Sequence, residues 1–369
     1  MAKRSTSVLP PELSHRLARL KAHAGSNAGQ ELKEVLDELA KLPAESIARA
    51  SSEIAASARL DRRLSRNAPI RVVPRGRFSL PLSWKVFAFD RIKKDPPTER
   101  DLLKINPDYA WLFLFHPNGH IREAALWHIN TPPRSPFFLA ALAWRLNDWV
   151  GQVRQAARRC IERIGAGVSS EVAAETGLYL LSRHLIWGRW RDEAKTLDRI
   201  LAREDVIAAI ADRLRMRTTG PMAACLRNAL RHPGIDRHLP ALAAQAIQPS
   251  VRAVAYQSLI SGKARWQTGY DWIWVDRVYG SRKRVPAFGT RELERSRPMA
   301  SDIADGLRDR SAFVRKIVAD AMIVVRAELP DERGVVALIA DDPSPAVRSR
   351  ADFMLRHPAA QSVSSTGEV

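Results

Sequence analysis

The stretch Asp342-Pro-Ser-Pro-Ala-Val347-Arg348-Ser-Arg-Ala351-Asp-Phe-Met-Leu355 decides the fold of this chain. Val347, Ala351 and Leu355 recur every four residues, which places them on one stripe of an α-helix. The preceding Asp-Pro-Ser-Pro reads as a turn, with Ser344 in the position of an N-cap and a proline at the first helical position. One helix with one apolar stripe cannot bury that stripe, so the stretch predicts a helix that stacks on its neighbours.

The same pattern recurs along the chain: an acid, an apolar-Arg pair five and six residues later, then small and apolar residues at intervals of four. It is found in segments 309–322 and 148–161, with His116 in the acidic position in segment 116–129, and without the acid in segment 251–259. The apolar-Arg pairs begin at 121, 153, 251, 314 and 347, which gives intervals of 32, 98, 63 and 33 residues. The longer intervals are close to three and two times the shorter ones, so degenerate units are expected between them.

This pattern resembles HEAT-type repeats, whose second helix often carries Asp…Val-Arg…Ala. The resemblance covers residues 100–357 and is most specific in the copies that begin at Asp148, Asp309 and Asp342. It implies an all-α, HEAT-like α-solenoid of stacked helical pairs, in which Asp and Arg side chains join neighbouring repeats in a ladder. Carried over residue by residue, the ladder positions are Asp148, Arg154, Asp309, Arg315, Asp342 and Arg348. A role for these arginines as ligands of a partner is the alternative.

Composition and pattern divide the chain into six segments. They are N-terminal helices at 1–66, an extended Pro/Arg-rich segment at 67–99 that packs on the solenoid, HEAT-like repeats at 100–262, a basic aromatic insertion at 263–299, further HEAT-like repeats at 300–357 and a disordered tail at 358–369. Thr98-Glu-Arg-Asp101 is similar to a capping box, with Asp in place of Glu, and opens a helix within this scheme.

The insertion alternates in the manner of a β-strand between Tyr270 and Tyr279, with aromatic and β-branched residues. Gly280-Ser281 follows, so the segment predicts a β-hairpin near 266–290 that turns there. Arg282 and Arg284 should share one face of the second strand and Lys283 the other. We expect the tryptophans of this segment to pack the hairpin onto the helices.

The chain is strongly basic, with 59 Lys and Arg against 40 Asp and Glu and a net charge of +19. Such an excess indicates a polyanionic partner, nucleic acid first and an acidic protein second. Cations beside aromatic side chains suit phosphate contacts combined with base stacking. The candidate nucleic-acid-binding residues are Arg71, Arg75, Arg77, Arg277, Arg282, Lys283, Arg284, Trp272 and Trp274. The alternatives are a solvated linker for the first three and a solvated charged turn for the hairpin cations.

The sequence favours a non-enzymatic protein. It has no phosphate-binding loop, dinucleotide fingerprint, nucleophile elbow or zinc-protease motif, and so no catalytic residue is assigned. The close group of His116, His120 and His128 lacks a further ligand, and Cys160 and Cys225 are expected in the core, so no metal or cofactor is predicted. Two alternatives remain: a HEAT-like alkylpurine DNA glycosylase and a scaffold subunit that binds protein.

The glycosylase alternative rests on a resemblance. Those enzymes combine a basic solenoid with aromatic side chains and a carboxylate beside the lesion, and the insertion supplies those residue types near Asp271 and Asp276. No family motif aligns on them, so no catalytic role is carried over. No run of residues reaches the roughly 18 apolar positions of a membrane span. A cytoplasmic protein without a membrane partner is therefore expected.

Overall fold

The computed structural model of the chain describes residues 7–20, 28–60, 97–183, 194–329 and 331–357. Within them the chain is 68% helical, with 18 α-helices and one two-stranded antiparallel sheet, so the all-α prediction is confirmed with a hairpin added. The fold consists of two compact units, Met1–Gly167 and Val168–Val369. Most of the predicted segment 67–99, and the whole predicted tail at 358–369, lie outside the described residues.

The first unit is built around α7. Its elements are α1 (Pro11–Arg19), α2 (Ala28–Ala40), η1 (Ala44–Ser46), α3 (Ile47–Ser57), α4 (Glu99–Ile105), α5 (Tyr109–Phe113), α6 (Gly119–His128), α7 (Pro136–Leu146), α8 (Gly151–Ile164) and η3 (Gly165–Gly167). The sequence of α7 is apolar on nearly every side, as expected of a helix in the interior. It packs against α2, α3 and α8, and Phe137 and Leu142 have no exposed surface.

The capping box predicted before α4 is confirmed. The Thr98 hydroxyl accepts from the Asp101 N–H, and the Asp101 carboxylate accepts from the Thr98 N–H at 3.1 Å. The hydrogen bonds from the Thr98 side chain and main chain lower the pKa of Asp101 from its usual value. Asp therefore completes this box in the position that Glu usually holds.

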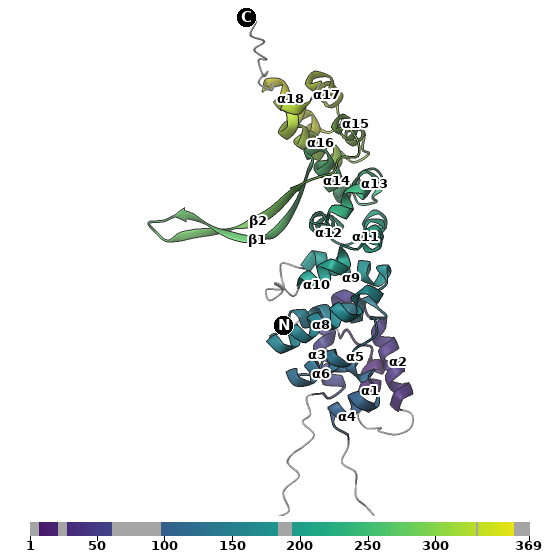
Figure 1. Ribbon diagram of the computed structural model, residues 1–369. Helices are drawn as coiled ribbons and strands as arrows, with labels where there is room; N and C mark the ends of the chain where they lie inside the picture. The colour runs from purple at the N-terminus through teal and green to yellow at the C-terminus, as the bar shows by residue number, and fades with distance from the viewer. Residues whose placement is uncertain (1–6, 21–27, 61–96, 184–193, 330, 358–369) are drawn as a thin grey trace, which may run out of the picture. The chain divides into compact units, whose positions relative to one another are not determined.

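The second unit contains α9 to α18 and the hairpin (Figure 1). Its elements are α9 (Ser170–Arg183), α10 (Ala194–Leu201), α11 (Glu204–Met216), α12 (Met222–Ala229), η4 (Pro233–His238), α13 (Leu239–Gln245), α14 (Pro249–Ser261), β1 (Lys263–Asp276), β2 (Ser281–Glu292), α15 (Met299–Leu307), α16 (Ala312–Val325), η5 (Arg326–Glu328), α17 (Glu332–Ala340) and α18 (Pro345–Arg356). Helix α14 packs against α12, α13 and α16, and α16 packs in turn against α18. The repeat-pattern segments 251–259, 309–322 and 342–355 are thus found largely within α14, α16 and α18.

An Asp–Arg ladder fastens these helices to one another. Arg315 donates from Nε and Nη2 to the two carboxylate oxygens of Asp342, at 2.7 and 3.0 Å, and from Nη1 to the main-chain carbonyl of Asp309 at 2.8 Å. Arg252 binds Asp309 with the same fork, at 2.7 and 2.9 Å. Hydrogen bonds from Arg315 lower the pKa of Asp342, and the hydrogen-bonded Asp309 carboxylate raises the pKa of Arg252. In each pair the opposite charge stabilises the ionised form. Each arginine therefore joins its own turn to the acid of the next turn.

The ladder aspartates also shape the turns in which they lie. Oδ1 of Asp342 accepts the Ser344 N–H at 2.8 Å, and Oδ1 of Asp309 accepts the Ser311 N–H at 2.7 Å. Ser344 occupies the N-cap position of α18, as predicted, but its side chain makes no capping hydrogen bond. The aspartate two residues earlier instead accepts the N–H of the N-cap residue itself, as short Asp side chains do in turns.

The first unit repeats the arrangement at Asp148. Arg122 forks onto its carboxylate at 2.9 and 2.8 Å, Arg145 adds a third contact at 2.8 Å, and Arg154 donates to its main-chain carbonyl. Arg145 is so deeply buried that desolvation lowers its pKa to about 10, partly offset by Asp148. His116 takes the place of the acid in the preceding turn, where its Nδ1 accepts the N–H of Asn118. A neutral imidazole can accept one such bond through a ring nitrogen, but it lacks the two carboxylate oxygens that an arginine fork needs.

The end of the ladder differs from its interior. Arg348 of α18 donates to the main-chain carbonyls of Asp342 and Pro343, at 2.7 and 3.1 Å, and makes no carboxylate contact within the described residues. The turn that would carry its acid does not follow among them. Arg348 is half-buried, as Arg315 is, but its acceptors are neutral carbonyls, whereas Arg252 and Arg315 each bind a carboxylate.

Candidate nucleic-acid interface

The hairpin is a two-stranded ribbon that projects from the helices of the second unit (Figure 1). Residues 277–280 form its turn, where Gly280 has a φ of 64°, a left-handed conformation that favours glycine. The Asp276 carboxylate fixes the turn by accepting the N–H groups of Val278 and Tyr279 at 2.8 and 3.1 Å. The predicted hairpin is confirmed, and its turn includes Gly280, whereas Ser281 is already the first residue of β2.

The root of the ribbon is anchored by a partly buried ion pair. Arg291 of β2 donates to both carboxylate oxygens of Asp236 at 2.7 and 2.5 Å, and to the carbonyl of Leu230 at 2.9 Å. Asp236 lies in η4 and is only 7% exposed. Ala264, at the start of β1, is fully buried beside it. The strands therefore leave the helices from a fixed base rather than from a loose linker.

His232 makes this root sensitive to pH. Burial, with the nearby charges of Arg231 and Arg291, lowers the pKa of His232 to about 4. In the unfolded chain the pKa of histidine is about 6.5. Between these values the unfolded chain binds a proton that the folded chain does not, so the free energy of unfolding falls as pH falls from about 6.5 to about 4.

We expect the variant His232→Asn to lose part of this pH dependence. The melting temperature is measured for parent and variant from pH 7 to pH 4. Carboxylates titrate in both proteins, so the difference between the two curves reports the histidine. Parallel curves would show that His232 does not carry the effect.

The strand register sorts the ribbon into two faces. Trp274 pairs with Arg282, Trp272 with Arg284, and Tyr270 with Pro286, and directly opposed residues lie on the same face. A register shift between Gln267 and Gly269 then brings Gln267 opposite Phe288 and Arg265 opposite Thr290. Residues of β2 alternate without interruption, so the partners of its even-numbered residues all share one face. We call this the aromatic–arginine face; its arginines and aromatic residues are Arg265, Tyr270, Trp272, Trp274, Arg282, Arg284 and Phe288.

Each arginine on this face lies close to at least one aromatic ring. The guanidinium carbon of Arg284 lies 3.9 Å from the ring centroid of Tyr270, and that of Arg265 lies 3.9 Å from Phe288. Arg282 lies between two indoles, 5.3 Å from Trp272 and 5.6 Å from Trp274. A ribbon of two strands is marginally stable by itself, and these cation–π contacts help to hold its strands together.

The rings nevertheless remain open to solvent. Trp272 is 60% exposed and Trp274 52%, with Tyr270 and Phe288 close behind at 46% and 47%. The expectation that these tryptophans pack the hairpin onto the helices is therefore wrong. Two strands have no third layer to cover them, although Trp266, which lies across Gly289 near the root, is half-buried.

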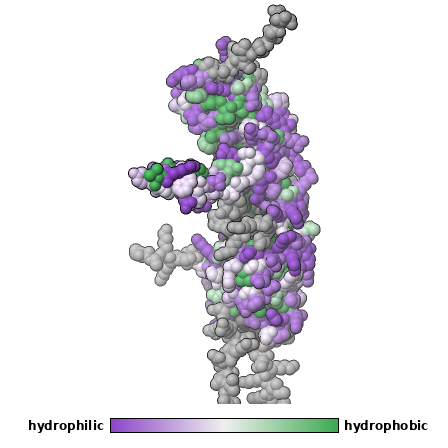
Figure 2. Space-filling model, turned by 60° about the vertical axis from the view of Figure 1, so that its left-hand side comes forward, coloured by the Kyte–Doolittle hydropathy of each residue, from purple (hydrophilic) through white to green (hydrophobic). Residues whose placement is uncertain are grey.

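The charge on the two faces differs. Between Arg265 and Trp274 the aromatic–arginine face carries three arginines and no carboxylate. Asp271 pairs with Val285 on the opposite face, beside Lys283 and Ile273. Figure 2 shows hydrophobic and hydrophilic surface side by side on the projecting ribbon. The face therefore offers positive charge next to flat apolar surface, the combination that binds phosphate and bases.

The structure brings only some of the predicted site residues together on one face. Trp272, Trp274, Arg282 and Arg284 come together on the aromatic–arginine face, while Lys283 lies on the opposite face and Arg277 is exposed in the turn. Arg71, Arg75 and Arg77 lie outside the described residues. Sequence reasoning missed Arg265, Tyr270 and Phe288 as members of the site. The alternating pattern of β1 could have placed Tyr270 on the same face as Trp272. Arg265 and Phe288 could be placed there only from the strand register, which the irregularity near Thr268 shifts by one residue.

The arrangement does not supply the pocket that a glycosylase would need from these residues. Asp271 lies on the face opposite Trp272 and Trp274, and Asp276 is used in the turn. Among the described residues no cluster of three His, Cys, Asp or Glu side chains is placed to hold a metal ion. Cys160 and Cys225 are buried, which raises the pKa of each thiol to about 12.

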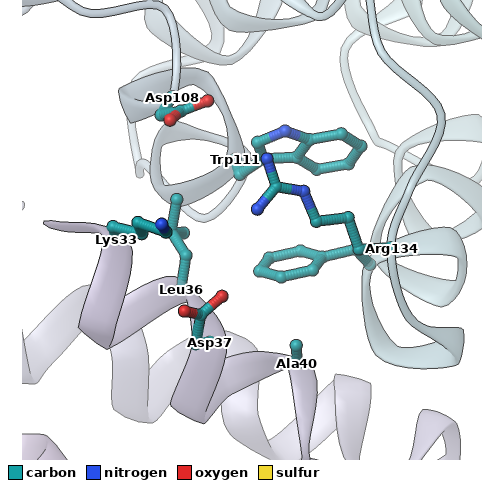
Figure 3. A pocket seen from close by; sticks show the side chains of 8 residues that line it. Lys33, Leu36, Asp37, Ala40, Asp108, Trp111 and Arg134 are labelled. Carbon is teal, nitrogen blue, oxygen red and sulfur yellow. The ribbon is translucent and has the colours of Figure 1, made fainter.

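A depression in the first unit lies between α2, α5 and α7 (Figure 3). Trp111 and Phe138 are among its apolar lining residues, with ring centroids 5.2 Å apart, and the Arg134 side chain extends beside Trp111. Lys33 and Asp37 border it from α2, so its lining has two cations and two carboxylates. Because these charges offset one another, the depression is a poorer match for a polyanion than the ribbon.

Comparisons of the chain with protein-family models, with curated proteins and with solved structures gave no match. In the described part of the chain, no helix has the length and apolar character needed to cross a membrane.

Proposed function

We propose that this protein is a non-enzymatic, HEAT-like α-solenoid that binds nucleic acid through the aromatic–arginine face of its ribbon. The repeated turn supports the architecture: Asp148, Asp309 and Asp342 each accept an N–H two residues on, a fork from an earlier arginine and a main-chain bond from an arginine six residues on. Identical bonding in three turns is what stacked repeats require, because each unit contacts mainly its neighbours.

The observation that carries the binding proposal is the sorting of charge on the ribbon. Three arginines and four half-exposed rings gather on one face, and no carboxylate interrupts them from Arg265 to Trp274. Folding alone gives little reason to concentrate cations there, since like charges repel. A phosphate backbone offsets this repulsion, and bases cover the exposed rings.

A scaffold that binds protein is the second candidate. The last helices of the second unit expose large apolar side chains, with Val324 at 80%, Leu355 at 64% and Leu338 at 57%. Figure 2 shows hydrophobic surface gathered over this end of the unit. Exposed apolar groups of this kind often mark protein interfaces.

Fluorescence anisotropy across salt concentrations tests the binding proposal. If the parent protein makes about five phosphate contacts with a duplex, the logarithmic salt slope is about −4.5, and affinity falls several hundredfold from 50 to 200 mM salt. Generic duplex DNA, single-stranded DNA and RNA are titrated in parallel. Absence of salt-sensitive binding to all three would overturn the proposal and leave the scaffold as the better one.

A further inference from the structure

The rings of the aromatic–arginine face are spaced for separated bases. Tyr270, Trp272 and Trp274 follow one another at every second residue of β1, on the same face. Neighbouring rings are therefore attached about 6.8 Å apart along the strand. Bases in a duplex are stacked about 3.4 Å apart along each strand. A ring on this ribbon thus meets every second base step, which leaves room for a base beside each ring.

A duplex cannot use these rings without being opened. The faces of its bases are covered by their neighbours, so an aromatic side chain can stack only after a base step is unstacked. In the grooves only base edges are available, and most of the exposed area of Trp272 and Trp274 would stay in water. An unpaired strand offers the faces directly, because its bases can turn outward and stack one by one.

The arginines lie close to the rings, where they can contact the phosphates that join such bases. Arg282 lies within 6 Å of both indoles, and Arg284 lies over Tyr270. A phosphate between two consecutive bases therefore finds a guanidinium beside each ring. A guanidinium over one side of a ring leaves the other side for a base, which agrees with rings about half exposed.

We infer that the aromatic–arginine face takes unpaired bases, so that the protein binds single-stranded DNA or RNA in preference to a duplex of the same sequence. This inference rests on the nucleic-acid proposal above and narrows it to one class of ligand. Binding is tolerant of sequence, because each ring contacts the π-face that every base has.

The test compares a fluorescein-labelled 20-nucleotide single strand of mixed sequence with its duplex, using the full chain at 150 mM salt. The single strand is expected to bind about tenfold or more tightly than the duplex. The variant Trp272→Ala/Trp274→Ala should lose about 30-fold in affinity for the single strand, or about 1 kcal/mol for each stacked base, and less than threefold for the duplex. Quenching of tryptophan fluorescence by an unlabelled single strand should fall in the same variant.

Two further variants keep the test specific. Ile273→Ala removes a half-exposed apolar side chain from the opposite face of the same strand and should leave both affinities unchanged. Trp272→Leu/Trp274→Leu keeps apolar bulk on the ribbon while removing the aromatic faces, and should reproduce the loss seen with alanine. Circular dichroism confirms that each variant is folded.

The outcomes separate this inference from the proposal beneath it. Salt-sensitive binding that is equal for both ligands, or insensitive to the tryptophans, would overturn the single-strand inference and leave the nucleic-acid proposal standing. No salt-sensitive binding to any nucleic acid would remove both. A preference for the single strand that disappears in both tryptophan variants supports both.

Discussion

Replacing Asp309 by Ala lowers the free energy of unfolding of the second unit by about 3–5 kcal/mol. The carboxylate holds the fork of Arg252, which is only 1% exposed and is among the most deeply buried large side chains of the chain. Removal of Asp309 leaves that guanidinium in a poorly solvated site without its counter-charge. The Ser311 N–H loses its acceptor as well. Both losses act in the same direction, so the effect is large for one substitution.

Urea denaturation followed by circular dichroism measures this effect, and Arg348→Ala is the matched control. Arg348 occupies the same position in its turn as Arg252, but it is half-buried and binds only main-chain carbonyls within the described residues. Its removal should cost about 1 kcal/mol, the usual net value of such hydrogen bonds. Equal costs for the two variants, or a loss below about 1 kcal/mol for Asp309→Ala, would show that the ladder does not fasten these helices.

The variant Arg282→Ala/Arg284→Ala is expected to weaken nucleic-acid binding about 50-fold at 0.1 M salt. Each arginine that contacts a phosphate contributes about 0.9 to the logarithmic salt slope on a duplex and about 0.7 on a single strand. Loss of both contacts should make the slope shallower by about 2 on the duplex and by about 1.4 on the single strand. Since phosphates carry no sequence information, the loss should be similar for all sequences. Anisotropy titrations at four or more salt concentrations give the slope.

Lys283 provides the matched control for this pair. It lies between the two arginines in sequence and points to the opposite face, so Lys283→Ala removes a neighbouring charge without touching the aromatic–arginine face. Its slope should equal that of the parent. Arg282→Lys/Arg284→Lys keeps the charges and should retain most of the slope. A slope that changes equally in the Lys283 and arginine variants would indicate general attraction to a basic protein rather than contact by this face.

Parts of the fold follow from local sequence patterns. Helix α7 is an example, because a serine at the cap, a proline at the first helical position and a long apolar run lie within a few residues of one another. The turn of the hairpin is also indicated locally, because glycine readily adopts the left-handed φ that Gly280 has there. The recurring Asp and Arg positions also pointed to ion pairs between turns.

The partners in those pairs were harder to predict. The ladder positions named from sequence omitted Arg122 and Arg252, although both occupy the same place in the pattern as Arg315. Which acid an arginine meets depends on the packing of helices up to 57 residues apart, and no local pattern encodes it. The exposure of Trp272 was missed for a related reason. Hydrophobicity predicts a preference for burial, but only the fold shows whether a covering layer exists.

The ladder passes the insertion without interruption. Arg252 at one side of it and Asp309 at the other form the same fork that Arg315 and Asp342 form in consecutive turns, although the whole ribbon lies between them in sequence. The Arg291–Asp236 fork at the root of the ribbon binds it to η4, while the Arg252–Asp309 fork accompanies the packing of α14 on α16. The ribbon is thus an insertion between two helices that remain joined to each other by the ladder. Changes in its length or in its exposed side chains should therefore leave intact the forks that join the helices on either side of it.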